Sequence, residues 1–120
     1  TLPLIFHTLL NSYDIILVPF QFTNQKSNKK RPAVIISSLD YNVERPDLII
    51  MAVTSQIKPT PIIGEVMIQS WQDASLLKPS VIKPVITTIE KKLVIQLMGK
   101  LKQNDLSSLQ GSLDIILAKK

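Results

Sequence analysis

Short apolar segments separated by turn residues run through most of this 120-residue chain. From residue 13 onward the segments are rich in β-branched side chains, which is typical of a small all-β domain. Residues 32–38 are apolar almost throughout, which places them at the centre of the sheet. Pro84 is expected to interrupt the strand that contains it. The full set of predicted strands is 13–20, 32–38, 47–56, 64–68, 80–89 and 93–101.

Three other segments predict turns or helices. Residues 39–47 are of types that favour a turn, and residues 71–77 fit one turn of 3₁₀- or α-helix. Near the C-terminus the apolar residues change to helical spacing, with Asn104 or Asp105 positioned to cap the start. The residues that recur in this way are Leu106, Leu109, Leu113, Ile116 and Leu117. The pattern predicts a mainly β, barrel-like sheet of about five or six strands closed by a C-terminal helix.

Residues 1–12 are apolar without a clear period and end in the turn-like pair Asn11-Ser12. We expect an appended segment, which packs on the body or frays, ahead of a single domain at residues 13–120. The apolar run at residues 1–10 is shorter than the roughly 18 residues of a membrane span and lacks the basic start of a signal peptide. A cytoplasmic location without a membrane partner is therefore expected.

The amino-acid composition excludes several kinds of functional site. The chain has no cysteine and therefore no disulfides, thiol nucleophiles or cysteine-bound zinc. Its single histidine argues against a histidine-based metal site. We predict no metal and no cofactor. The 14 basic residues outnumber the 9 acidic ones and give a formal charge of +5. This balance favours nucleic acid or an acidic protein as the partner.

Arg31 lies where a basic loop meets an apolar strand, in the sequence KSNKKRPAVIISS. Its guanidinium offers a planar fork that matches two phosphate oxygens, and Pro32 limits how far the residue before it can swing. Lys26, Lys29 and Lys30 precede it and raise the local positive potential. The alternative is a solvated basic loop whose arginine caps the sheet edge, which is the commoner case for these residue types.

Thr54, Ser55 and Gln56 follow the apolar strand at residues 47–53. Hydroxyl groups suit phosphate oxygens and amides suit base edges, so this tip fits nucleotide binding. The commoner alternative is that polar residues simply mark the end of a strand. Lys78 and Lys83 fit either an extension of a phosphate-binding face or ordinary surface lysines.

Two further residues have competing interpretations. Trp71 fits base stacking or, more commonly, the core. Glu65 fits a catalytic base or a structural ion pair or hydrogen bond. We expect His7 to be non-functional.

In their order along the chain, these segments resemble the PemK/MazF toxins of type II toxin–antitoxin systems. The resemblance is carried by YDIILVPF, FTNQ, KKRPAVIISS, DLIIMAVTSQ, GEVMI, Trp71, LLKPSVIKP, TIEKKLV and MGKL. It runs from Tyr13 to the C-terminal helix. It implies an SH3-like barrel, a homodimer, and metal-independent, sequence-specific cleavage of single-stranded RNA or mRNA. It also implies a partner antitoxin whose flexible acidic segment occupies the RNA groove.

The resemblance assigns catalytic roles to two residues, since the family's arginine before the proline falls on Arg31 and its strand-end threonine on Thr54. In this chemistry the ribose 2′-OH attacks the adjacent phosphorus and leaves a 2′,3′-cyclic phosphate and a 5′-OH. Arg31 suits the charge that grows on the phosphate oxygens, and Thr54 can donate to one of them. The residues predicted to bind RNA are Lys29, Lys30, Ser55, Gln56, Lys78 and Lys83.

The chain departs from the family pattern at two places. Tyr13-Asp14 stands where the family commonly has Gly-Asp, which we expect to alter only a turn. The loop TNQKSN holds no acid, and the late strand reads Lys83-Pro84-Val85 where some members have Arg-x-Asp. No general base is therefore predicted. The alternative function is a barrel of the same fold that binds RNA without cutting it, or that acts on gyrase.

Overall fold

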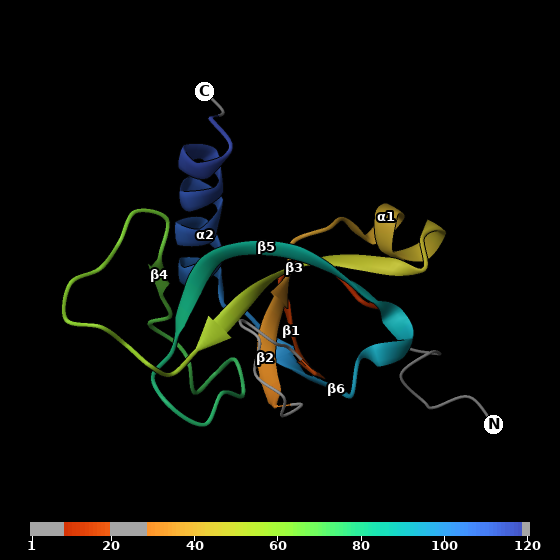
Figure 1. The fold of residues 1–120 in the computed structure, drawn as a ribbon, viewed down its shortest axis with the longest axis horizontal. Helices are drawn as coiled ribbons and strands as arrows, with labels where there is room; N and C mark the ends of the chain where they lie inside the picture. The colour runs from red at the N-terminus through yellow and green to blue at the C-terminus, as the bar shows by residue number, and fades with distance from the viewer. Residues whose placement is uncertain (1–8, 20–28, 119–120) are drawn as a thin grey trace.

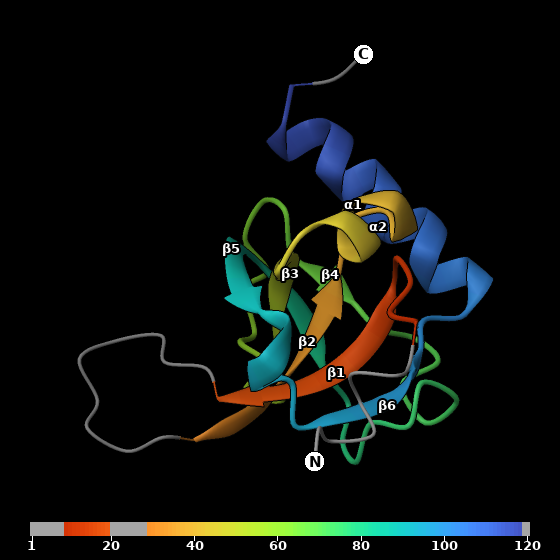
Figure 2. The ribbon, with the colours of Figure 1, turned by 90° about the vertical axis from the view of Figure 1, so that its right-hand side faces the viewer.

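The structure, a computed structural model, describes residues 9–19 and 29–118. Six strands form one antiparallel sheet in the order β4-β5-β3-β2-β1-β6. Figures 1 and 2 show this sheet curled into a half-barrel, with helix α2 packed at one end. The mainly β fold with a C-terminal helix is confirmed. The strands are β1 (Asp14–Pro19), β2 (Lys30–Ile35), β3 (Asp47–Thr54), β4 (Val66–Met67), β5 (Val81–Glu90) and β6 (Gln96–Lys100).

The central strands β1, β2 and β3 are buried on both faces. One face packs against α2 (Gln103–Ile116), through a core that includes Val34, Met51 and Leu109. The other face packs against residues 89–97 and Leu10, through a core that includes Ala33, Ile35 and Ile50. A strand with two buried faces needs an almost continuous apolar sequence, which explains residues 32–38 and confirms their central position.

Strand β5 is continuous through Pro84, so the expected interruption is a change of register instead. The pairing with β3 moves from Val53–Ile82 to Met51–Ile86 across this point. Strand β4 pairs only with Val81 and Ile82, so Pro84 lies where β5 has no described partner on its β4 side. Proline is tolerated at such an edge because a ladder hydrogen bond is not required there.

Residues 39–47 contain a helix, α1 (Leu39–Glu44), where the sequence predicted only a turn. The Ser38 hydroxyl caps it by accepting a hydrogen bond from the Tyr41 backbone N–H at 3.2 Å. Buried Asn42 then ties the helix to the sheet, since its amide donates to the carbonyl oxygen of Leu10 at 2.8 Å and to that of Ser37 at 3.2 Å. A short helix of weak propensity is therefore stabilised by tertiary hydrogen bonds.

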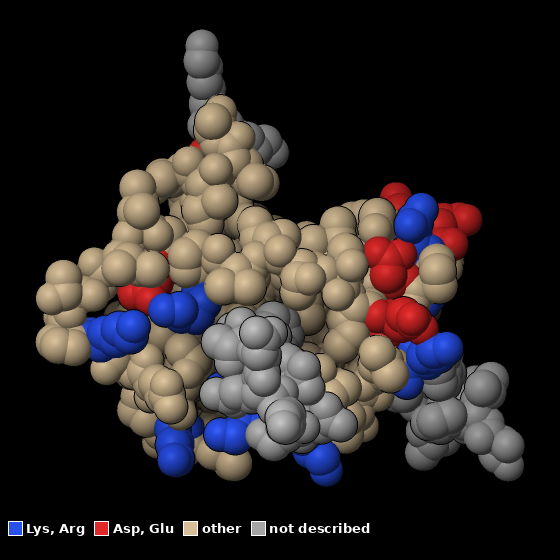
Figure 3. Space-filling model, in the orientation of Figure 1, with Lys and Arg blue, Asp and Glu red and all other residues tan. Residues whose placement is uncertain are grey.

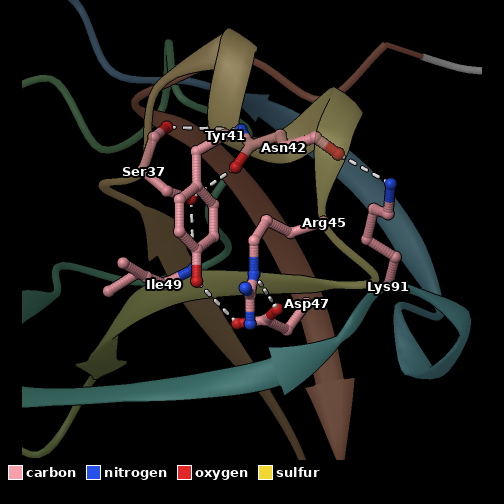
Figure 4. Close-up of polar contacts among 7 residues, drawn as sticks. All are labelled: Ser37, Tyr41, Asn42, Arg45, Asp47, Ile49 and Lys91. Atoms are coloured by element: carbon pink, nitrogen blue, oxygen red, sulfur yellow. Dashed lines mark hydrogen bonds and ion pairs between the residues drawn. The ribbon is translucent and has the colours of Figure 1, made fainter.

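The same polar network reaches neighbouring segments (Figure 4). The Ser37 hydroxyl donates to the Asn42 side-chain oxygen and accepts from the Ile49 N–H at 3.1 Å. Lys91 Nζ donates to the Asn42 carbonyl at 2.6 Å, and the Ser12 hydroxyl donates to the Ser37 carbonyl at 2.9 Å. Residues 9–12, the described part of the predicted N-terminal segment, thus pack on the body. The boundary at residue 13 stays a prediction.

The segment before β5 and the start of α2 also differ from expectation. Residues 69–75 form consecutive hydrogen-bonded turns without a helix. Helix α2 is confirmed, but the predicted caps are wrong, because Lys102 occupies the N-cap position. The buried Asp105 carboxylate instead accepts hydrogen bonds from the backbone N–H groups of Gln69 at 2.8 Å and Ser70 at 2.9 Å. The acid therefore anchors the turn segment and not its own helix.

Strand β6 contacts this turn segment at Gly99. A Cβ atom at Gly99 would lie 2.5 Å from the Ala74 carbonyl oxygen and 2.9 Å from the Ser75 hydroxyl. Ala74 is fully buried and cannot move aside freely. Only glycine allows this approach of the turn segment to β6.

We expect Gly99→Ala to lower the free energy of unfolding by about 1–3 kcal/mol, because the added methyl group overpacks against fixed backbone. Urea unfolding monitored by Trp71 fluorescence measures the change. The matched control is Gly111→Ala in α2, where an added Cβ meets nothing within 4 Å. The control should gain about 0.5–1 kcal/mol from helix propensity. Equal stability of the two variants would contradict the close contact at Gly99.

Candidate functional site

Arg31 of β2 and Thr54 of β3 lie at the same end of two neighbouring strands. The antiparallel pairing of these strands runs from Ile35–Ile50 to Ala33–Ala52, and the same register continued by two residues leads to Arg31 and Thr54. Side chains alternate along a strand, so both residues project on the face of Ala33 and Ala52. Both are half-buried, and Arg31 pairs on its other side with buried Val18 of β1. The fold thus places the two predicted catalytic residues at the same end of neighbouring strands.

The Thr54 hydroxyl also terminates its strand. Its oxygen accepts a hydrogen bond from the Gln56 backbone N–H at 3.1 Å, which turns the chain as β3 ends. A hydroxyl that accepts this bond keeps its own proton for a second acceptor, such as a phosphate oxygen. Both interpretations of the polar tip are therefore compatible. Ser55 and Gln56 are exposed.

Three of the predicted RNA-binding residues, Lys30, Ser55 and Lys78, line one cavity of about 250 Å³, which we call the lysine groove. Because Lys30 and Ser55 alternate with Arg31 and Thr54, the groove opens on the opposite face of the same sheet end. Among the described residues, none that lines it is acidic. These residues are Leu17, Lys30, Pro32, Ser55, Leu76, Leu77, Lys78, Ser80 and Met98.

Charge is distributed unevenly over the molecule. Figure 3 shows basic side chains without acidic neighbours along the lower rim, while acidic side chains gather at the right-hand end near α1. On the face shown, a polyanion is therefore attracted to the lower rim more than to the end near α1.

Lys83 is engaged elsewhere, in an ion pair with Glu65. Its Nζ lies 2.8 Å from Glu65 Oε2, and the other carboxylate oxygen accepts the Ile62 N–H at 3.2 Å. The hydrogen bond from Lys83 and then that from Ile62 hold the pKa of Glu65 below its ordinary value. The structural interpretation of Glu65 is confirmed, and Lys83 does not line the lysine groove.

The structure also places the remaining candidate residues. Trp71 packs against the core between the sheet and α2, which confirms the prediction that it belongs to the core. Lys29 is exposed just before β2 and lies outside the groove lining. Lys26 and His7 lie outside the described residues.

A second Arg-Pro pair, Arg45-Pro46, lies at the opposite end of β3 and is occupied by structural contacts. Arg45 Nε lies 3.1 Å from Asp47 Oδ1, and its guanidinium is 5.6 Å from the centre of the Tyr41 ring. The Tyr41 hydroxyl donates to Asp47 at 2.8 Å, and this hydrogen bond, followed by that from Arg45, lowers the pKa of the Asp47 carboxyl (Figure 4). An arginine before proline is therefore not a site by itself.

The sequence analysis missed the apolar part of the lysine groove. Its lining comes from β1, β2, β6 and the segment at residues 76–80, which only the fold brings together. The single hint in the sequence is Leu77, a second leucine directly before Lys78 in a turn segment.

Comparison with known proteins identifies the family. Residues 11–117 match the family described as PemK-like, MazF-like toxin of type II toxin-antitoxin system, and the chain belongs to this family. The predicted membership is confirmed. A search of curated proteins finds no match to the chain. No helix in residues 9–19 and 29–118 combines the length and apolar character needed to span a bilayer.

Several solved structures share the fold. A MazE–MazF complex from Deinococcus radiodurans is similar over 94% of this chain and 100% of its own, with 18% identity and a TM-score of 0.74. An endoribonuclease in complex with its cognate antitoxin, from a mycobacterial species, is similar over 93% and 96%, with 13% identity and a TM-score of 0.71. The Mycobacterium tuberculosis toxin MazF-mt6 is similar over 89% and 98%, with 17% identity and a TM-score of 0.70.

We expect Glu65→Gln to lower stability at pH 7, because Lys83 loses its ionic partner. The pKa of Glu65 is lower in the folded chain than its unfolded value near 4.5, so the stabilisation is fully present above that value. It disappears as pH falls through the folded pKa. Urea unfolding from pH 7 to pH 2.5 should show the stabilities of wild type and variant converging in acid.

Glu90→Gln, which breaks the exposed pair with Lys92, is the control and should change the stability little. A gap of constant size at all pH values would refute the ionic contribution.

Proposed function

We propose that this protein is the toxin of a type II toxin–antitoxin system and acts as an endoribonuclease on single-stranded RNA. Family membership and the fold shared with an endoribonuclease and with MazF toxins support the proposal. The observation that carries it is the β2–β3 register, which ends at Ala33–Ala52 and leaves Arg31 and Thr54 two residues further along, at the same end of the two strands. These are the residues to which the family resemblance assigns catalysis.

The proposed reaction is an in-line transesterification. The 2′-oxygen forms a bond to phosphorus and loses its proton, the bond from phosphorus to the 5′-oxygen breaks, and that oxygen gains a proton. The products are a 2′,3′-cyclic phosphate and a 5′-OH end. Arg31 donates two parallel hydrogen bonds to the non-bridging oxygens as their charge grows, and Thr54 donates one. We infer that the reaction proceeds in EDTA.

Binding of the flanking RNA is assigned to the exposed polar groups around this sheet end. Lys30, Ser55 and Lys78 hold the strand in the lysine groove, and Lys29 and Gln56 contact it beside the groove. Lys83 is assigned a structural role, since it is paired with Glu65. Each lysine that neutralises a phosphate releases a counterion, so affinity falls as salt rises.

The same positive surface suits the flexible acidic segment of an antitoxin. The solved relatives include toxins in complex with their antitoxins, which supports this partner. We also propose a cytoplasmic homodimer. Partly exposed apolar side chains on β5, Val85 and Ile86, are available for self-association in a domain this small.

A barrel that binds RNA without cutting it is the second candidate. The sequence of the loop before Arg31 favours it, because TNQKSN holds no carboxylate that can accept the 2′-proton. A third candidate is a gyrase-directed toxin of the same fold. Expression in cells distinguishes it from the nuclease and from the RNA-binding barrel, because a gyrase-directed toxin causes growth arrest with DNA damage and without RNA fragments.

We expect Arg31→Ala to reduce the rate of RNA cleavage by about 10²–10³-fold, the usual loss when one donor to a developing oxyanion is removed. Incubation of pure protein with RNA in EDTA, followed by mapping of both ends, measures rate, site and product chemistry together. Arg45→Ala is the matched control, because it removes the chain's other arginine at the far end of β3. Thr54→Val, which keeps the shape and removes the hydroxyl, should show a smaller loss.

Intact RNA after long incubation with folded wild-type protein would reject the nuclease. Retention of RNA on the protein in that case would support the binding-only barrel. Equal losses in Arg31→Ala and Arg45→Ala would remove Arg31 from the site.

A further inference from the structure

Leu77 is a large apolar side chain that stands almost fully in solvent, with an exposed fraction of 88%. Single exposed leucines are common on protein surfaces and need no function. Leu77 differs from an ordinary surface leucine because it lines the lysine groove and directly precedes Lys78, which lines the same groove.

The backbone that carries Leu77 is fixed at both ends. On the N-terminal side, the Asp105 carboxylate binds the N–H groups of Gln69 and Ser70, and Ala74 packs against Gly99. Next to Leu77, the side chain of Leu76 is buried in the core and its N–H donates to the Trp71 carbonyl at 3.0 Å.

On the C-terminal side, the Ser80 hydroxyl donates to the Lys78 carbonyl at 2.8 Å. Leu77 is therefore presented from a rigid segment, which lowers the entropy that a ligand must remove when it packs against the side chain.

The lining of the groove beside Leu77 combines apolar and positively charged residues. Leu17, Pro32 and Met98 supply apolar surface, while Lys30 and Lys78 supply charge. The volume of about 250 Å³ is below the range of drug-sized ligand pockets, so it suits a single ring system. One nucleotide within an RNA strand fits this lining, because its flat base is flanked by a negatively charged phosphate on each side.

We propose that the lysine groove takes one unpaired base of the RNA strand, and that Leu77 forms the wall that determines which base is accepted. This inference rests on the proposed function and adds to it a specificity-determining residue. Ser55 follows Thr54 and Lys30 precedes Arg31, so the groove and the catalytic pair lie on opposite faces of one sheet end. An RNA strand that passes over this end holds one phosphate at the pair and a neighbouring base in the groove. The hydroxyls of Ser55 and Ser80 line the groove and are placed to contact base edges.

The test uses the full-length protein and a pool of single-stranded RNA with randomised sequence. Cleavage sites are mapped by sequencing, and RNA retained on the protein is sequenced separately, so base preference is read with or without cleavage. The variants are Leu77→Ala and Leu77→Met, and the control is Ile63→Ala, whose side chain is 80% exposed outside the groove lining. Replacing such exposed side chains should leave the melting temperature unchanged.

We expect Leu77→Ala to lose preference at one base position and to raise KM about tenfold on the best sequence with kcat little changed, because packing against the base is lost. Leu77→Met should retain most of the preference, and Ile63→Ala should match wild type. A second arm measures binding of a synthetic acidic peptide to the same variants.

Each outcome separates this inference from the proposed function. Unchanged preference in Leu77→Ala, with normal cleavage, overturns the role of Leu77 and leaves the nuclease intact. Weaker peptide binding with unchanged RNA selection assigns Leu77 to a protein partner instead, and a change in sedimentation coefficient assigns it to self-association. Wild-type protein that neither cuts nor retains RNA rejects the proposed function itself.

Discussion

The candidate site depends on the pairing of β2 with β3 in a single register. Each strand is buried on both faces, so a slip of one residue would exchange the two cores and move Arg31 to the face away from Thr54. Packing of ordinary aliphatic side chains such as Val34 and Ile35 thus positions the polar pair. The two hydrophobic cores fix the register of β2 and β3, and this register positions Arg31 and Thr54 without any unusual backbone geometry at the sheet end.

Much of the fold was predictable because its signals are local. Strand positions and the C-terminal helix follow from the period of apolar residues, and the residue types of Arg31 and Thr54 marked them as candidates. Helix α1 and the role of Asp105 were not predictable, since each depends on partners distant in sequence. The same reason hid the apolar wall of the lysine groove and the pairing of Lys83 with Glu65.

The two arginine–proline pairs show what residue type alone leaves undecided. Both arginines are followed by proline, yet Arg45 lies before β3 beside an acid and an aromatic ring, whereas Arg31 lies within β2 and pairs with Val18 of β1. An arginine neutralised by Asp47 contributes to local structure and little to the attraction of an anion. The surroundings imposed by the fold therefore give the same dipeptide different uses.

The anchoring of residues 69–80 by Gly99 and Asp105 has a consequence for biosynthesis. Both anchors come after this segment in the sequence, so the lysine groove lacks a fixed wall until residue 105 has been synthesised. A nascent or prematurely terminated polypeptide would carry Arg31 and Thr54 without the finished groove. For a protein of a toxin family, this order of assembly delays a competent surface until the residues that anchor its wall have been made.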